Sequence, residues 1–483
     1  MEHTNDLLAS ATAYVDEVWE DVVADIDSLV QVESVEDREH ATEGAPFGPA
    51  PHEAVLRALS IADKLGLSTQ DCEGYLGYAE LIGSSEQYLA TIAHADIVPL
   101  GSGWTFDPLR VTRKEGYLLG RGVIDDKGPL VLSLYAAHYF VRETRRTGVK
   151  LPYTLRCLVG SNEETEMEDV DYYLARYPEP LFCFTPDAVF PLICGEKGQF
   201  FAEVRSASFE RGSGSIVSLE GGTVSNAIPG AARAVVRCGE ELDDAEGIHV
   251  SAAGTDDDGN ALFAIEAQGV GGHASMPEGT RNAIGMLVDY LLSHDLCTEQ
   301  ERAFLDFETA LFSSTDGSGL GIAATDDLFD PLTCIGGTIR TVEEEGHVCF
   351  LQTMDIRYPK STTGDVLKAA IDRAAHAHGC AVVDTSDAVP FYQDPTSEPV
   401  RALVDTFNAA TGRNEAPITI GGGTYARHFA HAVAFGPDDP SNPAPAWVGQ
   451  EHGPDEGVSE QVLKRALAIY IVAIRRLMEL SYE

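Results

Sequence analysis

The sequence predicts an α/β fold in which a layered α/β domain is interrupted by an inserted α+β domain. Helix and strand patterns alternate over residues 5–160, which is typical of α/β layers. Short alternating strands fill residues 197–395, as in antiparallel sheets with one wet face. The 483 residues also exceed the length of one ordinary core. We therefore expect a first domain from residues 1–196 and 396–483, and an insert from 197–395.

The elements of the first domain follow from hydrophobic periodicity. Apolar residues at three- and four-residue spacings predict helices over 5–31 and 52–65. Runs of apolar and β-branched residues without breakers predict strands over 75–82, 88–92 and 153–159. We expect a sheet of such strands covered by the helices.

The insert and the C-terminus show other patterns. Strands are predicted over 199–204, 231–237 and 261–268, and helices over 282–292 and 366–378. A C-terminal helix carries Val462, Ala466, Ile469, Ala473 and Leu477, and is nearly apolar all round over 467–474. We interpret that stretch as core packing, because it is far too short to span a membrane.

Charge excludes several partners. The 33 Lys and Arg residues against 77 Asp and Glu residues give a formal net charge of −44. Such a field repels phosphate backbones, so nucleic acid and anionic membranes are not expected to bind, and solubility is the simplest explanation of the charge. The nine cysteines are scattered without a Cys-x-x-Cys pair, and the chain starts without the basic and apolar regions of a leader. We expect a cytoplasmic protein.

Glu163 and Glu164 follow the strand predicted over 153–159. Successive side chains at a strand end diverge, so one carboxylate could bind a metal ion while the other acts on a water molecule. In isolation, a solvated loop of an acidic protein is the simpler explanation of this pair.

Two further motifs show the same logic. His94 and Asp96 lie just past the strand over 88–92, at the sheet edge where α/β proteins build sites. Asp125 and Asp126 lie between glycines and before a helix whose first turn holds Pro129. Such a turn can hold a carboxylate that bridges two cations, although acids at a helix start also occur for the dipole alone.

The ordered motifs resemble a known superfamily. They are Ala-His-Ala-Asp at 93–96, Arg-Gly-Val-Ile-Asp-Asp-Lys-Gly at 121–128, Asn-Glu-Glu-Thr at 162–165, Thr-Pro-Asp-Ala at 185–188 and Gly-Gly-Gly-Thr-Tyr-Ala-Arg at 421–427. Together they resemble the co-catalytic zinc metallopeptidases that include aminoacylases, carnosinases and desuccinylases, with bacterial PepV-type dipeptidases as the nearest branch. The resemblance implies a zinc-peptidase-like three-layer α/β/α catalytic domain with an inserted α+β lid domain. The large lid implies a monomer, with a homodimer as the alternative.

The resemblance implies two metal ions and their ligands. His94 and Asp187 would hold one ion, and Glu164 and His452 the other, with Asp125 bridging both. Nitrogen and oxygen donors without a thiolate suit two Zn²⁺, with Mn²⁺ or Co²⁺ as alternatives. The neighbouring Asp126 is the second choice for the bridge. Relatives tend to have a cis peptide bond between these two aspartates, and the sequence leaves open whether this chain has one.

The same resemblance assigns catalytic roles. Glu163 would be the general base, taking a proton from the attacking water and giving it to the leaving amine. Asp96 would orient the imidazole of His94.

The assignment of His452 includes a departure from the family pattern. The family has His-x-x-Asn-Glu, whereas here Pro-Asp-Glu stands at 454–456. His428 and His431 are competing ligands, but they are predicted to lie within a helix after Tyr425.

In the lid, His273 lies in Gly-Gly-His-Ala-Ser at 271–275 and would stabilise the oxyanion of the tetrahedral intermediate. Asn226 matches a substrate-contacting asparagine of the family. Their alternative explanations are a histidine in a glycine turn and a structural strand residue.

The substrate's carboxylate has its own candidates. Arg357 would clamp it bidentately, unless the arginine is only a strand residue. Gly422, Gly423 and Thr424 would offer backbone amides or a hydroxyl to the same group.

The sequence thus predicts a metal-dependent dipeptidase that hydrolyses unblocked dipeptides. A carnosine-type Xaa-His dipeptidase and an N-acyl amino acid deacylase are the alternatives among enzymes. A catalytically inactive small-molecule-binding homologue is the alternative outside enzymes, although the joint presence of Glu163 and all five implied ligands argues against it.

Overall fold

The chain forms two compact units. The structure is a computed structural model that describes residues 2–482, with side chains from residue 6. Unit 1 comprises Met1–Gly195, Tyr392–Ile418 and Gly423–Glu483, and unit 2 comprises Glu196–Phe391 and Thr419–Gly422. The predicted α/β class is confirmed, because unit 1 combines helices with a mixed sheet and unit 2 is of α+β type.

A mixed sheet of nine strands is the framework of unit 1. The strand order is β1-β2-β6-β3-β7-β22-β8-β20, with β21 beside β8. The bounds are β1 Ser68–Cys72, β2 Leu76–Leu81, β3 Tyr88–His94, β6 Thr154–Gly160, β7 Phe182–Thr185, β8 Ile193–Glu196, β20 Phe391–Tyr392, β21 Ile418–Ile420 and β22 Ala432–Ala434. The central strands β6, β3, β7 and β22 are parallel. Parallel pairing brings their carboxyl ends to one edge of the sheet.

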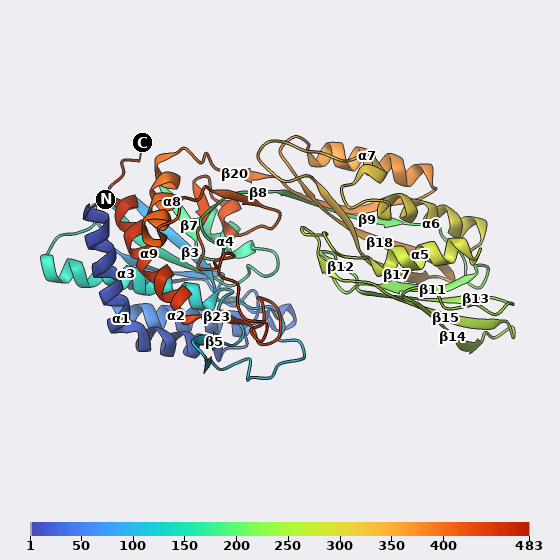
Figure 1. Cartoon of the computed structure of the whole chain (residues 1–483), viewed down its shortest axis with the longest axis horizontal. Coiled ribbons are helices and arrows are strands. Elements are labelled where there is room, and N and C mark those ends of the chain that lie inside the picture. Colours follow the sequence, from blue (N-terminus) through green and yellow to red (C-terminus); the bar gives the residue numbers. More distant parts are fainter. Residues whose placement is uncertain (1, 483) are drawn as a thin grey trace. The chain divides into compact units, whose positions relative to one another are not determined.

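Helices from distant parts of the chain pack together in unit 1. Their bounds are α1 Glu2–Val30, α2 Pro49–Leu65, α3 Lys127–Thr147, α4 Glu168–Leu174, α8 Glu398–Thr411 and α9 Glu460–Met478, with 3₁₀ helices η1 Arg38–His40 and η3 Tyr425–His428. A small sheet joins β4 Thr112–Lys114, β5 Tyr117–Leu119 and β23 Gly457–Ser459. Helices α1, α3 and α9 contact one another, although α1 and α9 come from opposite ends of the chain (Figure 1).

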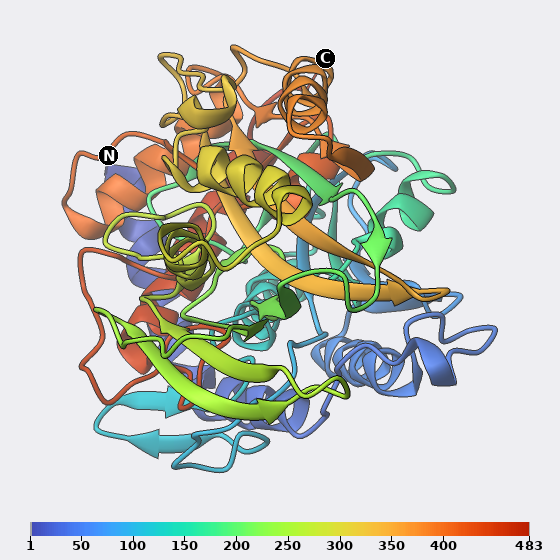
Figure 2. The ribbon, with the colours of Figure 1, turned by 90° about the vertical axis from the view of Figure 1, so that its right-hand side faces the viewer.

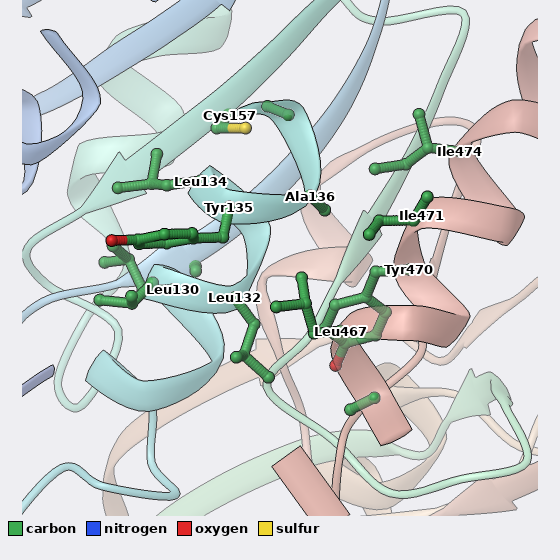
Figure 3. Packing of buried hydrophobic residues seen from close by; sticks show 14 of the residues in the cluster. Leu130, Leu132, Leu134, Tyr135, Ala136, Cys157, Leu467, Tyr470, Ile471 and Ile474 are labelled. Carbon is green, nitrogen blue, oxygen red and sulfur yellow. The ribbon is translucent and has the colours of Figure 1, made fainter. Parts of the chain in front are cut away.

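The core of unit 1 explains the apolar C-terminal helix. Every residue over 467–474 is buried, so the prediction of core packing is confirmed. Figure 3 shows Leu132 of α3 facing Leu467 of α9, with Tyr470 and Ile471 beside them. Burying each such leucine stabilises the fold by roughly 1.5–3 kcal/mol. No helix within residues 2–482 combines the length and apolarity needed to cross a membrane.

Unit 2 pairs its strands antiparallel, as predicted. The main sheet has the order β14-β15-β13-β11-β17-β18-β9-β19, with β10 beside β18, and β12 pairs with β16. The bounds are β9 Gly198–Arg205, β10 Phe209–Glu210, β11 Ile216–Gly221, β12 Ala227–Ile228, β13 Ala231–Arg237, β14 Ile248–Thr255, β15 Ala261–Gln268, β16 Gly272–His273, β17 Thr333–Glu344, β18 His347–Tyr358 and β19 Ala381–Ala388.

Helices cover one face of the unit 2 sheet. They are α5 Ala283–Ser293, α6 Glu299–Phe312 and α7 Gly364–Ala377, with the 3₁₀ helix η2 Ser318–Leu320. Their apolar side chains form one core with alternate residues of the strands, for example Phe200, Ala202 and Val204 of β9. Figure 2 shows the long strands β17 and β18 (gold) against α6 (yellow).

Four helix assignments differ from the sequence predictions. Helices α4, α6 and α8 were not predicted: α4 is only two turns long, and buried glutamates interrupt the apolar stripe of α6, whereas the apolar residues of α8 do follow a helical period. The helix predicted after Tyr425 is the single 3₁₀ turn η3, which includes His428 but ends before His431.

Candidate functional site

The carboxyl ends of three parallel strands carry the core of the site. His94 is the last residue of β3, Glu163 and Glu164 follow β6, and Asp187 follows β7. Because β6, β3 and β7 are neighbours and parallel, these four side chains come to one edge of the sheet. The loop before α3 adds Asp125 to the same cluster.

His94 is fully buried and faces acceptors on both sides. Its Nε2 lies 2.9 Å from Oδ1 of Asp125 and 3.8 Å from Oδ2 of Asp187. Its Nδ1 donates to the carbonyl oxygen of Asp96 at 3.1 Å and lies 3.5 Å from that residue's Oδ1. Burial lowers the pKa of His94, but the hydrogen bonds with Asp125 and Asp96 outweigh it and raise that pKa well above its usual range. With Nδ1 held as a donor, Nε2 is the nitrogen that can bind a cation.

His452 approaches Asp125 from the other side. Its Nε2 lies 2.8 Å from Oδ2 of Asp125 and 3.1 Å from Oε2 of Glu164. These two carboxylates raise the pKa of His452 to about 11. The two oxygens of Asp125 thus face two different histidines, which is the arrangement expected of a bridging carboxylate.

Asp126 points elsewhere, and its peptide bond with Asp125 is cis. Its Oδ2 accepts a hydrogen bond from the backbone N–H of His94 at 3.0 Å, and the side chain is fully buried. This contact supports the choice of Asp125 over Asp126 as the bridge.

The acids of the cluster repel one another. Two groups of possible ligands share His94: one adds Asp125 and Glu164, and the other adds Glu163 and Asp187. Within each group, one ligand atom of every residue lies within 4.8 Å of the others. Burial and the Asp125 carboxylate raise the pKa of Asp187 to about 8, and burial together with Asp187 raises that of Glu163 well above its usual range. Divalent cations would relieve this repulsion, and imidazole and carboxylate donors without thiolates suit such ions. The donor set therefore fits divalent metal ions.

Asp96 connects the two halves of the cluster. While its carbonyl accepts from His94, its Oδ2 accepts the backbone N–H of Glu164 at 3.1 Å. The carbonyl makes the shorter contact with the imidazole, and the orienting role of Asp96 stays a prediction.

Sequence reasoning missed the support beneath the Glu163 loop. The hydroxyl of Tyr425 donates to Oδ2 of the buried Asp169 at 2.5 Å, and the same oxygen accepts the backbone N–H of Ser161 at 2.7 Å. A Cβ on Gly160 would lie 2.1 Å from the Tyr425 hydroxyl, so only glycine fits there. The signal was present, because Tyr425 lies in the motif at 421–427.

His428, a competing ligand, lies against Asp171, with Nδ1 3.1 Å from Oδ1 of that carboxylate. Among the described side chains, the contacts with Asp125 and Glu164 belong to His452 instead. The structure therefore supports His452 over His428.

In unit 2, two predicted substrate-contacting residues are neighbours. Asn226 precedes β12 and His273 ends β16, and these strands pair with Ala227 opposite His273. Nδ1 of His273 accepts the backbone N–H of Ser275 at 3.2 Å. In the neutral ring the proton therefore lies on Nε2, which makes that nitrogen a donor suited to an oxyanion.

Arg357 is buried on β18 and its fork is engaged. Nε and Nη2 donate to the two oxygens of Asp355 at 2.6 and 2.8 Å, and Nη1 donates to the carbonyl of Gly421 at 3.3 Å. Asp355 and the Gly421 carbonyl thus already engage the guanidinium, and the role of Arg357 in binding a substrate carboxylate stays a prediction.

The remaining predicted residues lie where the chain passes between the units. Gly422 belongs to unit 2, whereas Gly423 and Thr424 belong to unit 1. The hydroxyl of Thr424 accepts the backbone N–H of Ala426 at 3.1 Å and caps η3. Their role in binding a carboxylate stays a prediction.

Comparison with known proteins identifies similar chains. The sequence model of peptidase family M20/M25/M40 matches residues 90–476. The chain is 31% identical over 467 residues to the Beta-Ala-Xaa dipeptidase of Lactobacillus delbrueckii subsp. lactis, covering 94% of this chain and 96% of that protein. Two solved structures share its fold. The di-peptidase Dug1p of Saccharomyces cerevisiae has a TM-score of 0.59 at 12% identity, covering 99% of both chains. Human carnosine dipeptidase 1 has a TM-score of 0.55 at 14% identity, covering 98% of this chain and 100% of that one.

Proposed function

The chain belongs to peptidase family M20/M25/M40, and from this membership we propose a dipeptidase that hydrolyses unblocked dipeptides with two bound metal ions. That it is a metal-dependent hydrolase of peptide bonds follows from the family. The observation that carries the finer proposal is Asp125, whose two oxygens face His94 and His452 within a cluster of four carboxylates. Zn²⁺ is the ion we propose, with Mn²⁺ or Co²⁺ as alternatives.

The proposed ligands divide between the ions as the family pattern implies. His94 and Asp187 would hold one, Glu164 and His452 the other, and Asp125 would bridge them. Bound divalent ions supply Lewis acidity, which makes a water molecule more acidic and a peptide carbonyl more electrophilic.

Glu163 would carry the proton. One carboxylate oxygen accepts a proton from the attacking water, and the same proton passes to the amide nitrogen as the C–N bond breaks. The products are a free carboxylate and a free amine. His273 would donate from Nε2 to the oxyanion of the tetrahedral intermediate, and Asn226 beside it would contact the substrate.

Both ends of a dipeptide would be recognised. The acidic cluster favours a protonated α-amino group, and Arg357 with Gly422, Gly423 and Thr424 would bind the α-carboxylate. We propose residues 197–395 as a lid on a monomeric enzyme. The nine cysteines are all free thiols, which supports a reducing cytoplasm.

A dipeptidase preferring β-alanyl dipeptides is the second candidate. It is favoured by the 31% identity to a Beta-Ala-Xaa dipeptidase. Carnosine-type Xaa-His cleavage belongs to the same class of activity, and N-acyl amino acid deacylation is the third candidate.

A substrate panel separates these candidates. We expect α-dipeptides to be hydrolysed, tripeptides and dipeptide amides to be poor substrates, and a chelator to abolish turnover until Zn²⁺ or Mn²⁺ is restored. Fast cleavage of β-Ala-His with slow cleavage of α-dipeptides would establish the second candidate. Cleavage of N-acyl amino acids alone would contradict the dipeptidase proposal, and no chelator-sensitive hydrolysis would indicate an inactive binding homologue.

A further inference from the structure

The loop that carries His452 adopts an unusual backbone. His452 and Asp455 have φ values of +62° and +54°, in the left-handed region that residues with a Cβ rarely adopt. The His452 side chain is itself half exposed, so its own packing does not hold it in place. Beside the Nε2 contacts with Asp125 and Glu164, contacts of the surrounding loop must therefore hold its backbone in this conformation.

Glu456 provides the first of these contacts. Its side chain is fully buried, and its Oε2 accepts from Nη1 of Arg121 at 2.6 Å. Its Oε1 accepts the backbone N–H groups of Gly122 at 2.9 Å and Ile124 at 3.3 Å. The residue that follows Ile124 is Asp125, so Glu456 holds the loop of the proposed bridging ligand.

Arg121 connects Glu456 to the loop that carries His452. Its Nη2 donates to the carbonyl oxygen of His452 at 3.1 Å and lies 3.4 Å from that of Leu100. The guanidinium is 1% exposed. The Arg121–Glu456 ion pair thus connects the loop before Asp125 with the backbone of His452 itself.

Asp455 holds the same loop from outside. Its Oδ1 accepts the backbone N–H of Thr105 at 2.8 Å and that of Phe106 at 3.2 Å, and its Oδ2 accepts the Thr105 hydroxyl at 2.6 Å. This residue stands where the family pattern has asparagine, and it supplies the oxygen acceptors there.

We propose that Arg121 and Glu456 are positioning residues that set the spacing between Asp125 and His452 and thereby the affinity for the second metal ion. The inference rests on the proposed function of this cluster as a two-metal site. A buried ion pair by itself contributes little net stability, whereas residues that orient metal ligands change metal affinity by about 10- to 100-fold. Because Arg121 donates directly to the carbonyl oxygen of His452, we assign the pair to the orientation of a metal ligand and not to general stability.

Two conservative variants test the pair. Arg121→Lys keeps the charge but cannot reach both Glu456 and the His452 carbonyl with one fork, and Glu456→Gln keeps the shape but removes the charge. Glu80→Gln is the matched control, because it breaks the Glu80–Arg156 ion pair (2.7 Å) between β2 and β6 of the same unit. Metal content and dissociation constants are measured on the full chain by titrating Zn²⁺ against a chromophoric chelator, and folding is checked by circular dichroism.

We expect two ions per wild-type chain and two per control. In Arg121→Lys and Glu456→Gln, we expect one ion to bind normally and the other about 10- to 100-fold more weakly. Excess Zn²⁺ should then restore kcat. If the ion-pair variants do not fold, Asp455→Ala at its partly exposed position carries the test, with a smaller weakening of the same ion expected.

Folded variants that bind both ions with wild-type affinity would overturn the inference. Equal weakening in Glu80→Gln would also overturn it, because the effect would then belong to any ion pair of the unit. A wild-type chain that binds no metal ion would instead contradict the proposed function.

Discussion

At the scale of single residues, the adjacent Glu163 and Glu164 lie on one short loop but contact different residues. Glu164 contacts His452 at 3.1 Å, and its backbone N–H is held by Asp96. Glu163 belongs with His94 and Asp187 in the second group of possible ligands. The divergence of adjacent side chains therefore separates the two carboxylates, but both remain close enough to bind an ion. Their division of roles stays a prediction.

Glu163→Gln tests that division. An amide cannot accept the proton, so we expect kcat to fall by about 10²–10⁴-fold while two metal ions remain bound. Glu164→Gln is the comparison, and we expect it to lose one ion. Turnover by stopped assay and metal content by mass spectrometry are measured on both variants. Metal loss from the Glu163 variant alone would show that the roles are exchanged.

At the scale of the element, helix α6 buries two glutamates in opposite circumstances. Glu301 caps the helix start, where its carboxylate accepts from Thr298 and from the backbone N–H groups of Ser215 and Ile216. Glu308 is fully buried, and neither of its oxygens has a hydrogen-bond partner among the described residues. Burial raises the pKa of Glu308 well above its usual range. Burial and the nearby Glu308 carboxyl also raise the pKa of the Cys380 thiol to about 12.

Glu308 predicts a pH-dependent stability. Its pKa is higher in the folded than in the unfolded chain, so above the ordinary glutamate pKa the folded state holds the extra proton. Stability then falls as pH rises towards the folded pKa, by up to about 1.4 kcal/mol per pH unit from this group. We expect Glu308→Gln to remove this loss, so its advantage over wild type in urea unfolding should grow between about pH 5 and pH 8. The exposed Glu299→Gln on the same helix is the control, and a pH-independent advantage of the Glu308 variant would contradict the prediction.

At the scale of the whole molecule, charge opposes folding. The 77 acidic residues outnumber the 33 basic residues, and their repulsion is stronger in the compact chain than in the expanded one. At the candidate metal site the same excess places carboxylates beside His94 and His452. If metal ions bind there as proposed, acidic repulsion that lowers stability elsewhere would favour their binding.

Salt should therefore stabilise this protein. The screening length falls from about 10 Å at about 0.1 M salt to about 3 Å at about 1 M, which weakens the repulsion among exposed acids. We expect the melting temperature of the metal-loaded chain to rise over this range by calorimetry. Potassium and choline chlorides should act alike if screening is the cause. A melting temperature that falls with either salt would contradict the explanation.

The sequence predicted those parts of the site that depend on local patterns. The strands ending at His94 and before Glu163 were readable from apolar runs, and parallel pairing of β3 and β6 then brings their ends together. Helix α6 was missed because buried acids interrupt its apolar stripe, whereas α8 was missed although Val400, Leu403, Val404 and Phe407 repeat with helical spacing. The contact between Asp169 and Tyr425 joins residues 256 positions apart, and no local pattern encodes it.

By itself, the sequence determined the α/β class, the donor types and the order of the motifs, because side-chain periodicity and chemistry are local properties of the chain. Only the tertiary structure decided that each oxygen of Asp125 faces a different histidine and that Asp355 occupies one side of the Arg357 fork. It also decided that Arg121 and Glu456, 335 positions apart, join two ligand loops. The physical reason is that such contacts are selected by the packing of the whole chain, where burying a charge requires a partner that folding alone can bring close.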